Sequence, residues 1–442
     1  MQRHPSVQDP AGGAHFIGLD VHKRVVQACV LDAAGTLLRE VRFDCTAANL
    51  RAFASDQLVA HSQAALEATC HTWAIVDALA EGAAVDVPIV VSNPMRTRAI
   101  ASAKVKTDRI DARVLAELLR CDYLPRVWQP DAATRTQRRR SSHRAALVAQ
   151  RTACKNRLHA MLTQRLIVCP HAELFGNKGL QWLQQLELDP EAALVRQAEL
   201  AILATLQAQL KLLHDAQAHS AWDDPRVKLL MTLPGVDMTV AQTLLAAWGD
   251  ISRFDCAERA SAYLGLAPST HASADKCYHG AITKHGNSRA RWLLVQAAQH
   301  LDKHPGPLGV QFKRLAARKN RNIAVVAMAR KLACIAYLML QRNEPYRYAL
   351  PAPTQNKLAR LRVAATGVRR KSGPAARTPR SASPETPQRT TPALGNVLMK
   401  EQLPALVPLA PGELRMLDRL GLAQLPAQLD SPSSRPRRRA AH

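Results

Sequence analysis

Three short apolar runs between residues 15 and 43 constrain the fold most: FIGL, VVQACVL and LLREVRF. They are rich in β-branched and large apolar residues, and AAGT between the second and third is typical of a tight turn. After them, residues 47–59 are expected to be helical, AALEAT to be a short strand, TWAIVDALAEG to be a helix ending at glycine, and VDVPIVVSNP to be a buried strand closed by proline. The order βββαβαβα predicts an α/β domain with a mixed sheet.

Such an order suits a ribonuclease-H-like domain, which residues 15–125 would fill. Residues 1–14 are expected to be a disordered leader. Residues 126–220 show apolar positions at three- and four-residue spacing, which predicts a helical or coiled-coil arm. Residues 221–345 form a second, mainly α unit. Residues 346–442 are expected to be a largely disordered Pro/Arg-rich tail, in which LPALVPLAPGELRMLDRLGL is a possible short docking helix.

The formal net charge of +25 and the isoelectric point near 10.3 indicate a polyanionic partner, and nucleic acid is the first candidate. A membrane surface is disfavoured, because there is no uninterrupted apolar run near 18 residues and no lone amphipathic anchor. The nine cysteines are scattered and contain no CxxC pair, so zinc spacing is absent and reduced, cytosolic thiols are expected. The first residues lack the apolar core of a signal peptide.

Four acidic residues form the first candidate site. Asp20 ends the run FIGLD, Glu67 ends a later strand, and Asp108 and Asp111 share one face of a helix that Thr107 can cap. Like charges at that spacing repel, and a hard divalent cation such as Mg²⁺, or Mn²⁺ in its place, would remove the penalty. The alternative is that each acid is solvated or paired with a neighbouring Lys or Arg. Basic side chains around the helix could contact phosphates: Lys104, Lys106, Arg109 and Arg113.

The second candidate site lies in the C-terminal unit. LMTLPGVDMTVAQTLLAAWGD reads as two helices joined by a turn, in which Gly235 could present backbone N–H groups to a DNA phosphate; an ordinary helix–helix turn is the alternative. Ser273 lies in a loop of small residues, HASAD, and a serine hydroxyl needs an activating environment to act as a nucleophile. Cations that could stabilise charge on a phosphate follow it: Lys276, Lys284, Arg289 and Arg291.

The segments FIGLDVHK, LEAT and KTDRIDARVLAELL resemble the DEDD motifs of insertion-sequence transposases of the 110/116/902 group, whose N-terminal domain is similar to the RuvC resolvase. In that resemblance Asp20, Glu67, Asp108 and Asp111 match the four acidic positions in order.

AYLGLAPSTHASADKCYHGAITKHGNSRARWLLVQAA likewise resembles the transposase domain of this group, with its GL-x-P, Ser-Ser-Gly and G-x-I-x-K-x-G-N pattern. Ser273 aligns with the second serine of the triplet, the position taken as the nucleophile. Ala272 and Ala274 depart from the pattern, and Ser269 is the fallback nucleophile.

The resemblance implies a transposase or recombinase in which Ser273 attacks a DNA phosphodiester, assisted by Mg²⁺ at the DEDD site. It also implies a bridge RNA that pairs with DNA, and a homodimer or homotetramer, for which the helical arm is the natural contact, in the bacterial cytosol or nucleoid. Two alternatives stay open: a RuvC-like junction-resolving endonuclease that uses water, and a non-catalytic nucleic-acid-binding protein.

Overall fold

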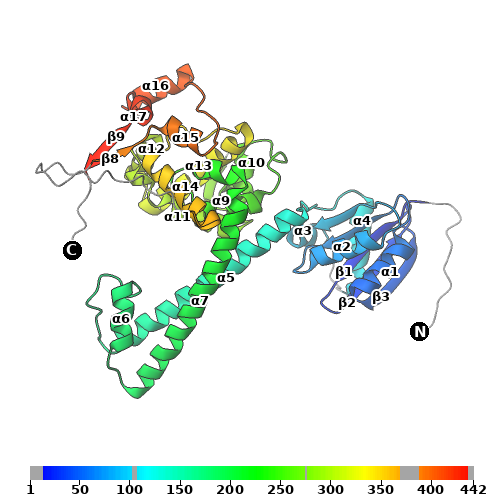
Figure 1. Ribbon diagram of the computed structural model, residues 1–442. Coiled ribbons are helices and arrows are strands. Elements are labelled where there is room, and N and C mark those ends of the chain that lie inside the picture. The colour runs from blue at the N-terminus through cyan, green and yellow to red at the C-terminus, as the bar shows by residue number, and fades with distance from the viewer. Residues whose placement is uncertain (1–12, 102–106, 274–275, 369–387, 437–442) are drawn as a thin grey trace, which may run out of the picture. The chain divides into compact units, whose positions relative to one another are not determined.

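The computed structural model of the chain describes residues 13–101, 107–273, 276–368 and 388–436 (Figure 1). It divides into two compact units, Met1–Pro130 and Asp131–His442. The N-terminal unit is built on a sheet, whereas the C-terminal unit is mainly helical, and each has its own hydrophobic core.

A five-stranded mixed sheet in the order β3-β2-β1-β4-β5 forms the N-terminal unit, as the sequence predicts. Strands β1 to β3 pair antiparallel as a meander, and β4 and β5 extend the sheet in parallel with β1. The elements are β1 (Phe16–Val21), β2 (Val25–Leu31), β3 (Leu37–Asp44), α1 (Ala47–Gln57), β4 (Gln63–Glu67), α2 (Thr72–Gly82), β5 (Ile89–Ser92), α3 (Pro94–Ile100) and α4 (Asp108–Arg120).

The two faces of this sheet are covered by different helices. Because successive side chains on a strand point to opposite faces, Ile17 and Leu19 pack in the same buried cluster as residues of α1 and α2. On the other face, Cys29 and Leu31 pack against Ala112 of α4. Residues of β1 and β4 that alternate with the first set therefore face α4.

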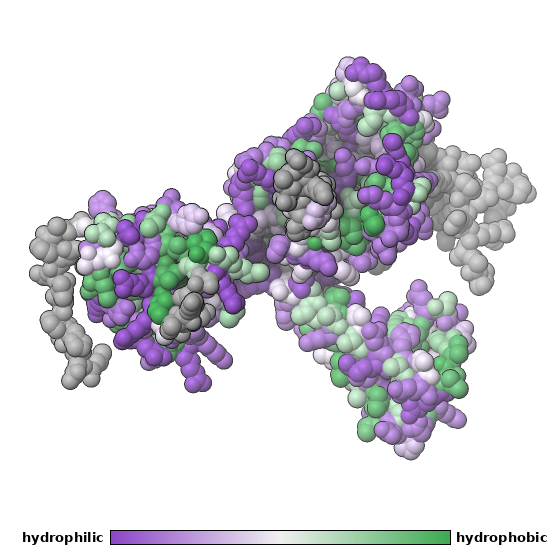
Figure 2. Space-filling view, turned by 180° about the vertical axis from the view of Figure 1, so that it is seen from behind, coloured by the Kyte–Doolittle hydropathy of each residue, from purple (hydrophilic) through white to green (hydrophobic). Residues whose placement is uncertain are grey.

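A pair of long helices, α5 (Ala132–Thr163) and α7 (Pro190–Trp222), begins the C-terminal unit, with α6 (Asn177–Gln185) at the far end of the pair (Figure 1). Around α6, a small core that includes Leu158, Leu183 and Leu203 is buried. The predicted long helices are therefore present, but a coiled-coil seam is not confirmed. Apolar side chains of α7 remain exposed, and Figure 2 shows hydrophobic residues at the surface of this arm.

The main C-terminal core surrounds α13 (Arg321–Arg342). The other elements are α8 (Pro225–Leu230), α9 (Met238–Trp248), α10 (Ala257–Tyr263), β6 (Pro268–Ser273), β7 (Lys276–Ile282), α11 (Ser288–Ala298), the 3-10 turn η1 (Leu301–Lys303), α12 (Pro307–Arg318), α14 (Pro351–Thr366), β8 (Gln388–Thr391), α15 (Leu394–Lys400), α16 (Pro411–Arg419), α17 (Leu425–Asp430) and β9 (Ser433–Pro436). By length and composition α13 could cross a membrane, but half of its apolar stretch is buried within the protein, as in the core helix of a globular domain.

The prediction of a largely disordered tail after residue 346 is not confirmed for the described residues. Helix α14 packs on α7, and its Leu358, Leu361 and Ala365 join the main core. Residues of α15, α16 and α17 join the same core. High proline and arginine content hid a helical spacing of apolar residues, which is enough to bury one face of each short helix. A helix, α16, lies within residues 403–422, where the sequence suggests a short docking helix.

Candidate active site

Helix α4 lies directly on β1 because the residues at the contact are small. A Cβ on Gly18 would stand 2.0 Å from the carbonyl oxygen of Ala112 and 2.5 Å from the backbone nitrogen of Ala116. No side chain other than hydrogen fits at position 18 without moving the helix. Ala112 and Ala116 are themselves fully buried. This close approach brings the N-terminal turn of α4 to the end of β1.

Asp20 and Glu67 occupy neighbouring strand ends on the face that α4 covers. The parallel register pairs Leu19 with Leu66, so Asp20 and Glu67 follow at equivalent positions. Leu19 and Leu66 are fully buried on the opposite face. The alternation of a strand therefore places both acids on the α4 side.

Asp108 and Asp111 lie in the first turn of α4, which Thr107 caps as the sequence predicts. The Thr107 hydroxyl accepts a hydrogen bond from the Ile110 backbone N–H at 3.3 Å. Carboxylates in the first turn interact favourably with the helix dipole, which partly offsets their mutual repulsion. The chain thus places acidic residues from β1, β4 and α4 at one end of the sheet.

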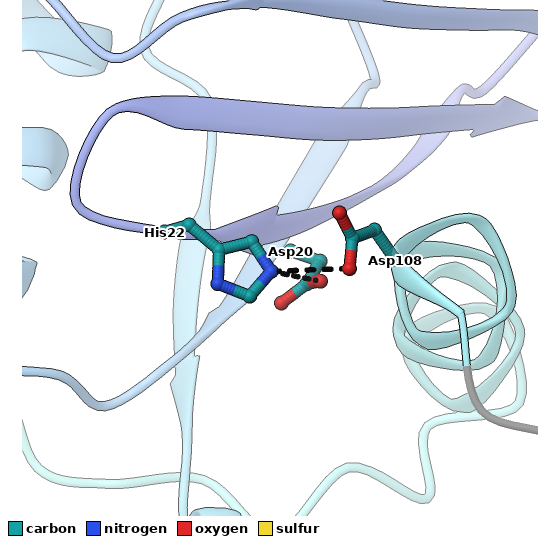
Figure 3. Close-up of side chains that lie close together, drawn as sticks. All are labelled: Asp20, His22 and Asp108. Atoms are coloured by element: carbon teal, nitrogen blue, oxygen red, sulfur yellow. Dashed lines mark hydrogen bonds and ion pairs between the residues drawn. The ribbon is translucent and has the colours of Figure 1, made fainter.

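His22 contacts two of these acids, and the sequence interpretation missed it. Its Nε2 lies 3.1 Å from Asp20 Oδ2 and 3.2 Å from Asp108 Oδ1 (Figure 3). One ligand atom from each of the three residues lies within 4.8 Å of the others. The signal in the sequence was DVHK, in which His22 is two positions after Asp20 and directly follows the end of β1.

The pKa of Asp20 is raised, mainly because burial disfavours its charged form. His22 opposes this shift, whereas the negative charges of Asp111 and Asp108 add to it. The site offers carboxylate oxygens and one imidazole nitrogen, which are ligands of divalent cations. A bound cation would also relieve the repulsion between the negative charges. The donor chemistry therefore matches the metal that the DEDD motif implies.

A shallow groove of about 380 Å³ begins beside these acids and runs toward β2 and β3. Its walls include Thr107, Asp108 and Arg109 of α4 and Glu40 and Arg42 of β3. Arg109 is 74% exposed and lies 3.8 Å from Glu40, a separation at which a solvated ion pair contributes little. Arg113 lines a separate surface hollow on α4. The predicted phosphate contacts Lys104 and Lys106 lie outside the described residues.

Ser273 ends β6 in a two-stranded hairpin, where the sequence interpretation expected a loop. The register pairs Ser273 with Lys276 of β7. The side chains of Ser273 and Lys276 lie outside the described part of the structure. Ser269 precedes them on β6, at an irregularity of the register between Pro268 and Thr270. Lys284, just after the hairpin, has the left-handed backbone conformation, with φ of 57°.

The two arginines expected to contact phosphates make internal hydrogen bonds. Arg289 donates to the carbonyl oxygen of Ser141 on α5 at 2.6 Å, and Arg291 donates to that of Leu264 at 2.9 Å. Burial lowers the pKa of Arg289, and the nearby Arg144 lowers it further. Both arginines therefore help to hold the C-terminal core together, whatever else they contact.

Gly235 lies in the turn between α8 and α9. The sequence predicts a helix-hairpin-helix-like element at this place. Its φ is 75°, and a Cβ there would stand 2.5 Å from the carbonyl oxygen of Ala297 on α11. The carboxylate of Asp237 accepts from the Val240 backbone N–H at 2.9 Å and so caps α9. Packing against α11 accounts for this glycine, and an anion approaching α9 would meet the Asp237 cap.

Comparison with known protein families matches both halves of the chain. Residues 17–167 match a family model described as "Transposase", of the DEDD type of insertion sequence 110, and residues 227–312 match "Transposase IS116/IS110/IS902 family".

Individual relatives match parts of the chain. A putative transposase, y4qE, of Sinorhizobium fredii is 31% identical over 44% of this chain and 48% of its own length. The transposase for insertion sequence element IS1111A of Coxiella burnetii is 35% identical over 27% of this chain and 34% of its own length. The chain thus spans about half or less of these two relatives. A pilin gene-inverting protein of Moraxella bovis is 25% identical over 58% of this chain and 74% of its own length. The two family models match consecutive parts of the chain, the first with the DEDD motifs and the second with the serine motif. The chain therefore belongs to the IS110/IS116/IS902 family of transposases.

Proposed function

We propose that this protein is a DNA transposase or recombinase that excises and inserts an insertion-sequence element. The observation that carries the proposal is the convergence of Asp20, His22 and Asp108, with ligand atoms within 4.8 Å, at the sheet edge where Glu67 also ends its strand. Membership of a transposase family supports DNA as the substrate.

The acidic residues Asp20, Glu67, Asp108 and Asp111 would hold Mg²⁺ or Mn²⁺. When bound, such an ion supplies Lewis-acid stabilisation of charge on a phosphate and on the leaving oxygen. The carboxylates of Asp20 and Asp108 would hold it from two elements, β1 and α4, that Gly18 keeps in contact. Arg42 and Arg109 line the groove beside Asp108 and would attract the neighbouring phosphates of the strand.

Ser273 is the proposed nucleophile. Its Oγ would form a bond to phosphorus while one ester bond from that phosphorus to a deoxyribose oxygen breaks. The serine proton passes to a base or solvent, and the released deoxyribose oxygen takes up a proton. The phosphoserine link conserves the bond energy, so the reverse attack by a different strand end rejoins the DNA. Ser269 is the fallback position, since Ala272 and Ala274 depart from the family pattern.

Nucleic-acid contacts are proposed for Lys104, Lys106, Arg109, Arg113, Lys276, Lys284, Arg289 and Arg291, whereas Gly235, predicted as a further contact, is accounted for by its packing against α11. The net charge of +25 is compatible with binding both DNA and a guiding bridge RNA. The proposal includes a homodimer or homotetramer, because several strands must be cut together. The exposed apolar side chains of the arm, which include Leu194 at 68% and Leu212 at 62% exposure, support a contact there. A bacterial cytosolic or nucleoid location follows from the DNA substrate.

The experiment incubates the full-length protein, purified with its co-expressed RNA, with a supercoiled plasmid that carries the element ends, in Mg²⁺. Denaturing electrophoresis and mass spectrometry then map any covalent protein–DNA link. We expect an adduct at Ser273 that Ser273→Ala and Asp108→Asn abolish and Ser269→Ala preserves. An adduct at Ser269 would move the nucleophile. Cleavage without an adduct would indicate a hydrolytic nuclease, and binding without cleavage in any metal would indicate a non-catalytic protein.

A further inference from the structure

His22 is placed by the turn between β1 and β2. Its backbone N–H donates to the carbonyl oxygen of Val25 at 2.9 Å, which closes the hairpin directly after Asp20 and Val21. Both carboxylates lie on the same side of the imidazole, with Nε2 directed at them and the other ring nitrogen directed away (Figure 3). The hairpin turn thus holds the backbone of His22, while its imidazole, 55% exposed, contacts the two acids.

The spacing of the three donor atoms resembles the edge of a coordination octahedron. Neighbouring ligands of a six-coordinate ion with bonds of about 2.1 Å are separated by about 3.0 Å, and opposite ligands by about 4.2 Å. The Nε2–Oδ2 and Nε2–Oδ1 distances of 3.1 and 3.2 Å fit the first value. The two carboxylate oxygens lie no more than 4.8 Å apart, a limit that includes both values. Small movements would bring them onto one ion.

The donor type also bears on the identity of the ion. Mg²⁺ prefers oxygen ligands and keeps several waters, whereas imidazole nitrogen suits later divalent metals better. We infer that His22 is a ligand of the metal site through Nε2 and shifts the preference of the site from Mg²⁺ toward Mn²⁺. This inference rests on the proposed metal-dependent function. It adds a nitrogen ligand to the four acids of the DEDD motif, which supply only oxygen.

The alternative role for His22 is to pair with the two carboxylates only while no metal is bound, and then to leave. Both roles predict the hydrogen bonds in Figure 3. They differ once the metal is present, because only a ligand remains within bonding distance of it. The test therefore measures nitrogen coordination directly, on the full-length protein without DNA.

Mn²⁺ is added to the metal-free protein, and electron spin-echo modulation records coupling between the manganese electrons and ¹⁴N. His22→Gln removes the imidazole, and His71→Gln is the matched control, because His71 lies four residues after Glu67 and outside the cluster. We expect nitrogen coupling in the wild type and in His71→Gln but not in His22→Gln. Calorimetry should show the Kd for Mn²⁺ rising about tenfold in His22→Gln, with the Kd for Mg²⁺ changing less than about threefold.

Each other outcome is decisive. Bound Mn²⁺ without nitrogen coupling in the wild type overturns the role of His22 while leaving a carboxylate metal site, and with it the proposed function, intact. Nitrogen coupling that survives His22→Gln assigns the ligand to another residue. Failure of the wild type to bind Mn²⁺ or Mg²⁺ at all removes the metal-dependent function itself. The wild-type spectrum needs no variant, so a folding defect in His22→Gln would not blunt the test, and His22→Asn provides a second variant.

Discussion

Gly18 of β1 and Ala112 of α4 meet backbone to backbone, so that a Cβ at position 18 would stand 2.0 Å from the Ala112 carbonyl oxygen. The distance between the acids of β1 and those of α4 depends on this contact. We expect Gly18→Ala to destabilise the N-terminal unit by about 1–3 kcal/mol, because the helix must move to admit a methyl group. Urea denaturation measures the loss, and Mn²⁺ binding should weaken with it. Gly395→Ala is the control, because a Cβ at that position meets nothing within 4 Å. An equal loss of unfolding free energy in this control would show that the effect does not come from the β1–α4 contact.

Removing one charge from the acidic cluster should stabilise the metal-free protein. Burial raises the pKa of Asp20, and Asp111 and Asp108 add to the shift, so its ionised form costs folding free energy at neutral pH. We expect Asp20→Asn to raise the unfolding free energy in EDTA by about 1 kcal/mol. The order should reverse in excess Mg²⁺, because only the wild type gains from binding. Thermal denaturation with and without metal checks this, with the exposed Asp86→Asn as control. A loss of stability in EDTA would favour the ion-pair interpretation of the acids.

Lys357 should give the C-terminal unit a distinctive pH dependence. Its ammonium group donates to the carbonyl oxygens of Leu233 and Val236, and burial lowers its pKa to about 8 from 10.5. Between those two values the unfolded chain binds more protons than the folded one, so this group makes stability rise with pH across that window and has no effect below it. The full rise is on the order of 3 kcal/mol. Lys357→Met should flatten the rise relative to the wild type in denaturation at pH 7.5 to 9.5, while Lys319→Met at the exposed end of α12 should not.

Truncation separates the ordered extension from a dispensable tail. Removing everything after Leu350 deletes α14, whose Leu358 and Leu361 are buried and would each forfeit about 1.5–3 kcal/mol. We therefore expect this variant to unfold or aggregate. Truncation after Val368 keeps α14, removes β8, β9 and α15 to α17, and should have a smaller effect. The midpoints of urea denaturation of the purified variants test this. If the variant that ends at Leu350 had the wild-type midpoint, the tail would be dispensable after all.

Local patterns predicted much of the N-terminal unit. The segments that form β1 to β5 are rich enough in β-branched and apolar residues to be predicted as strands. Thr107, as an N-cap residue, indicates the start of α4. The acids could be paired from spacing because Asp108 and Asp111 share a helix face, and because strand ends of a parallel pair meet at one edge. His22 follows Asp20 by two positions in DVHK, but only the structure of the β1–β2 turn shows that its side chain, among those of several histidines, reaches the acids.

The C-terminal unit was less predictable because its contacts join distant parts of the chain. Arg289 and Arg291 look like phosphate ligands in sequence, yet both donate to backbone carbonyls, one of them 148 residues away. Gly235 resembles a phosphate-binding glycine, yet α11 occupies the space over it. Cations and glycines serve packing and binding equally well, so composition does not separate these uses. Apolar spacing in α14 was present but masked by proline and arginine around it.

Helix α5 connects the C-terminal core to the far end of the helical arm. Near its start, Arg138 donates to the carbonyl oxygens of Ala246 and Ala247 on α9. The carbonyl oxygen of Ser141 accepts a hydrogen bond from Arg289 of α11. The helix contains neither glycine nor proline from Ala132 to Thr163, so it bends little. Beyond Ser141 it extends roughly 33 Å, and a tilt of about 10° at its base would sweep its far end through about 6 Å. Because α5 is stiff and its base is hydrogen-bonded to α9 and α11, a force on its far end would be transmitted to the Arg138 and Arg289 hydrogen bonds.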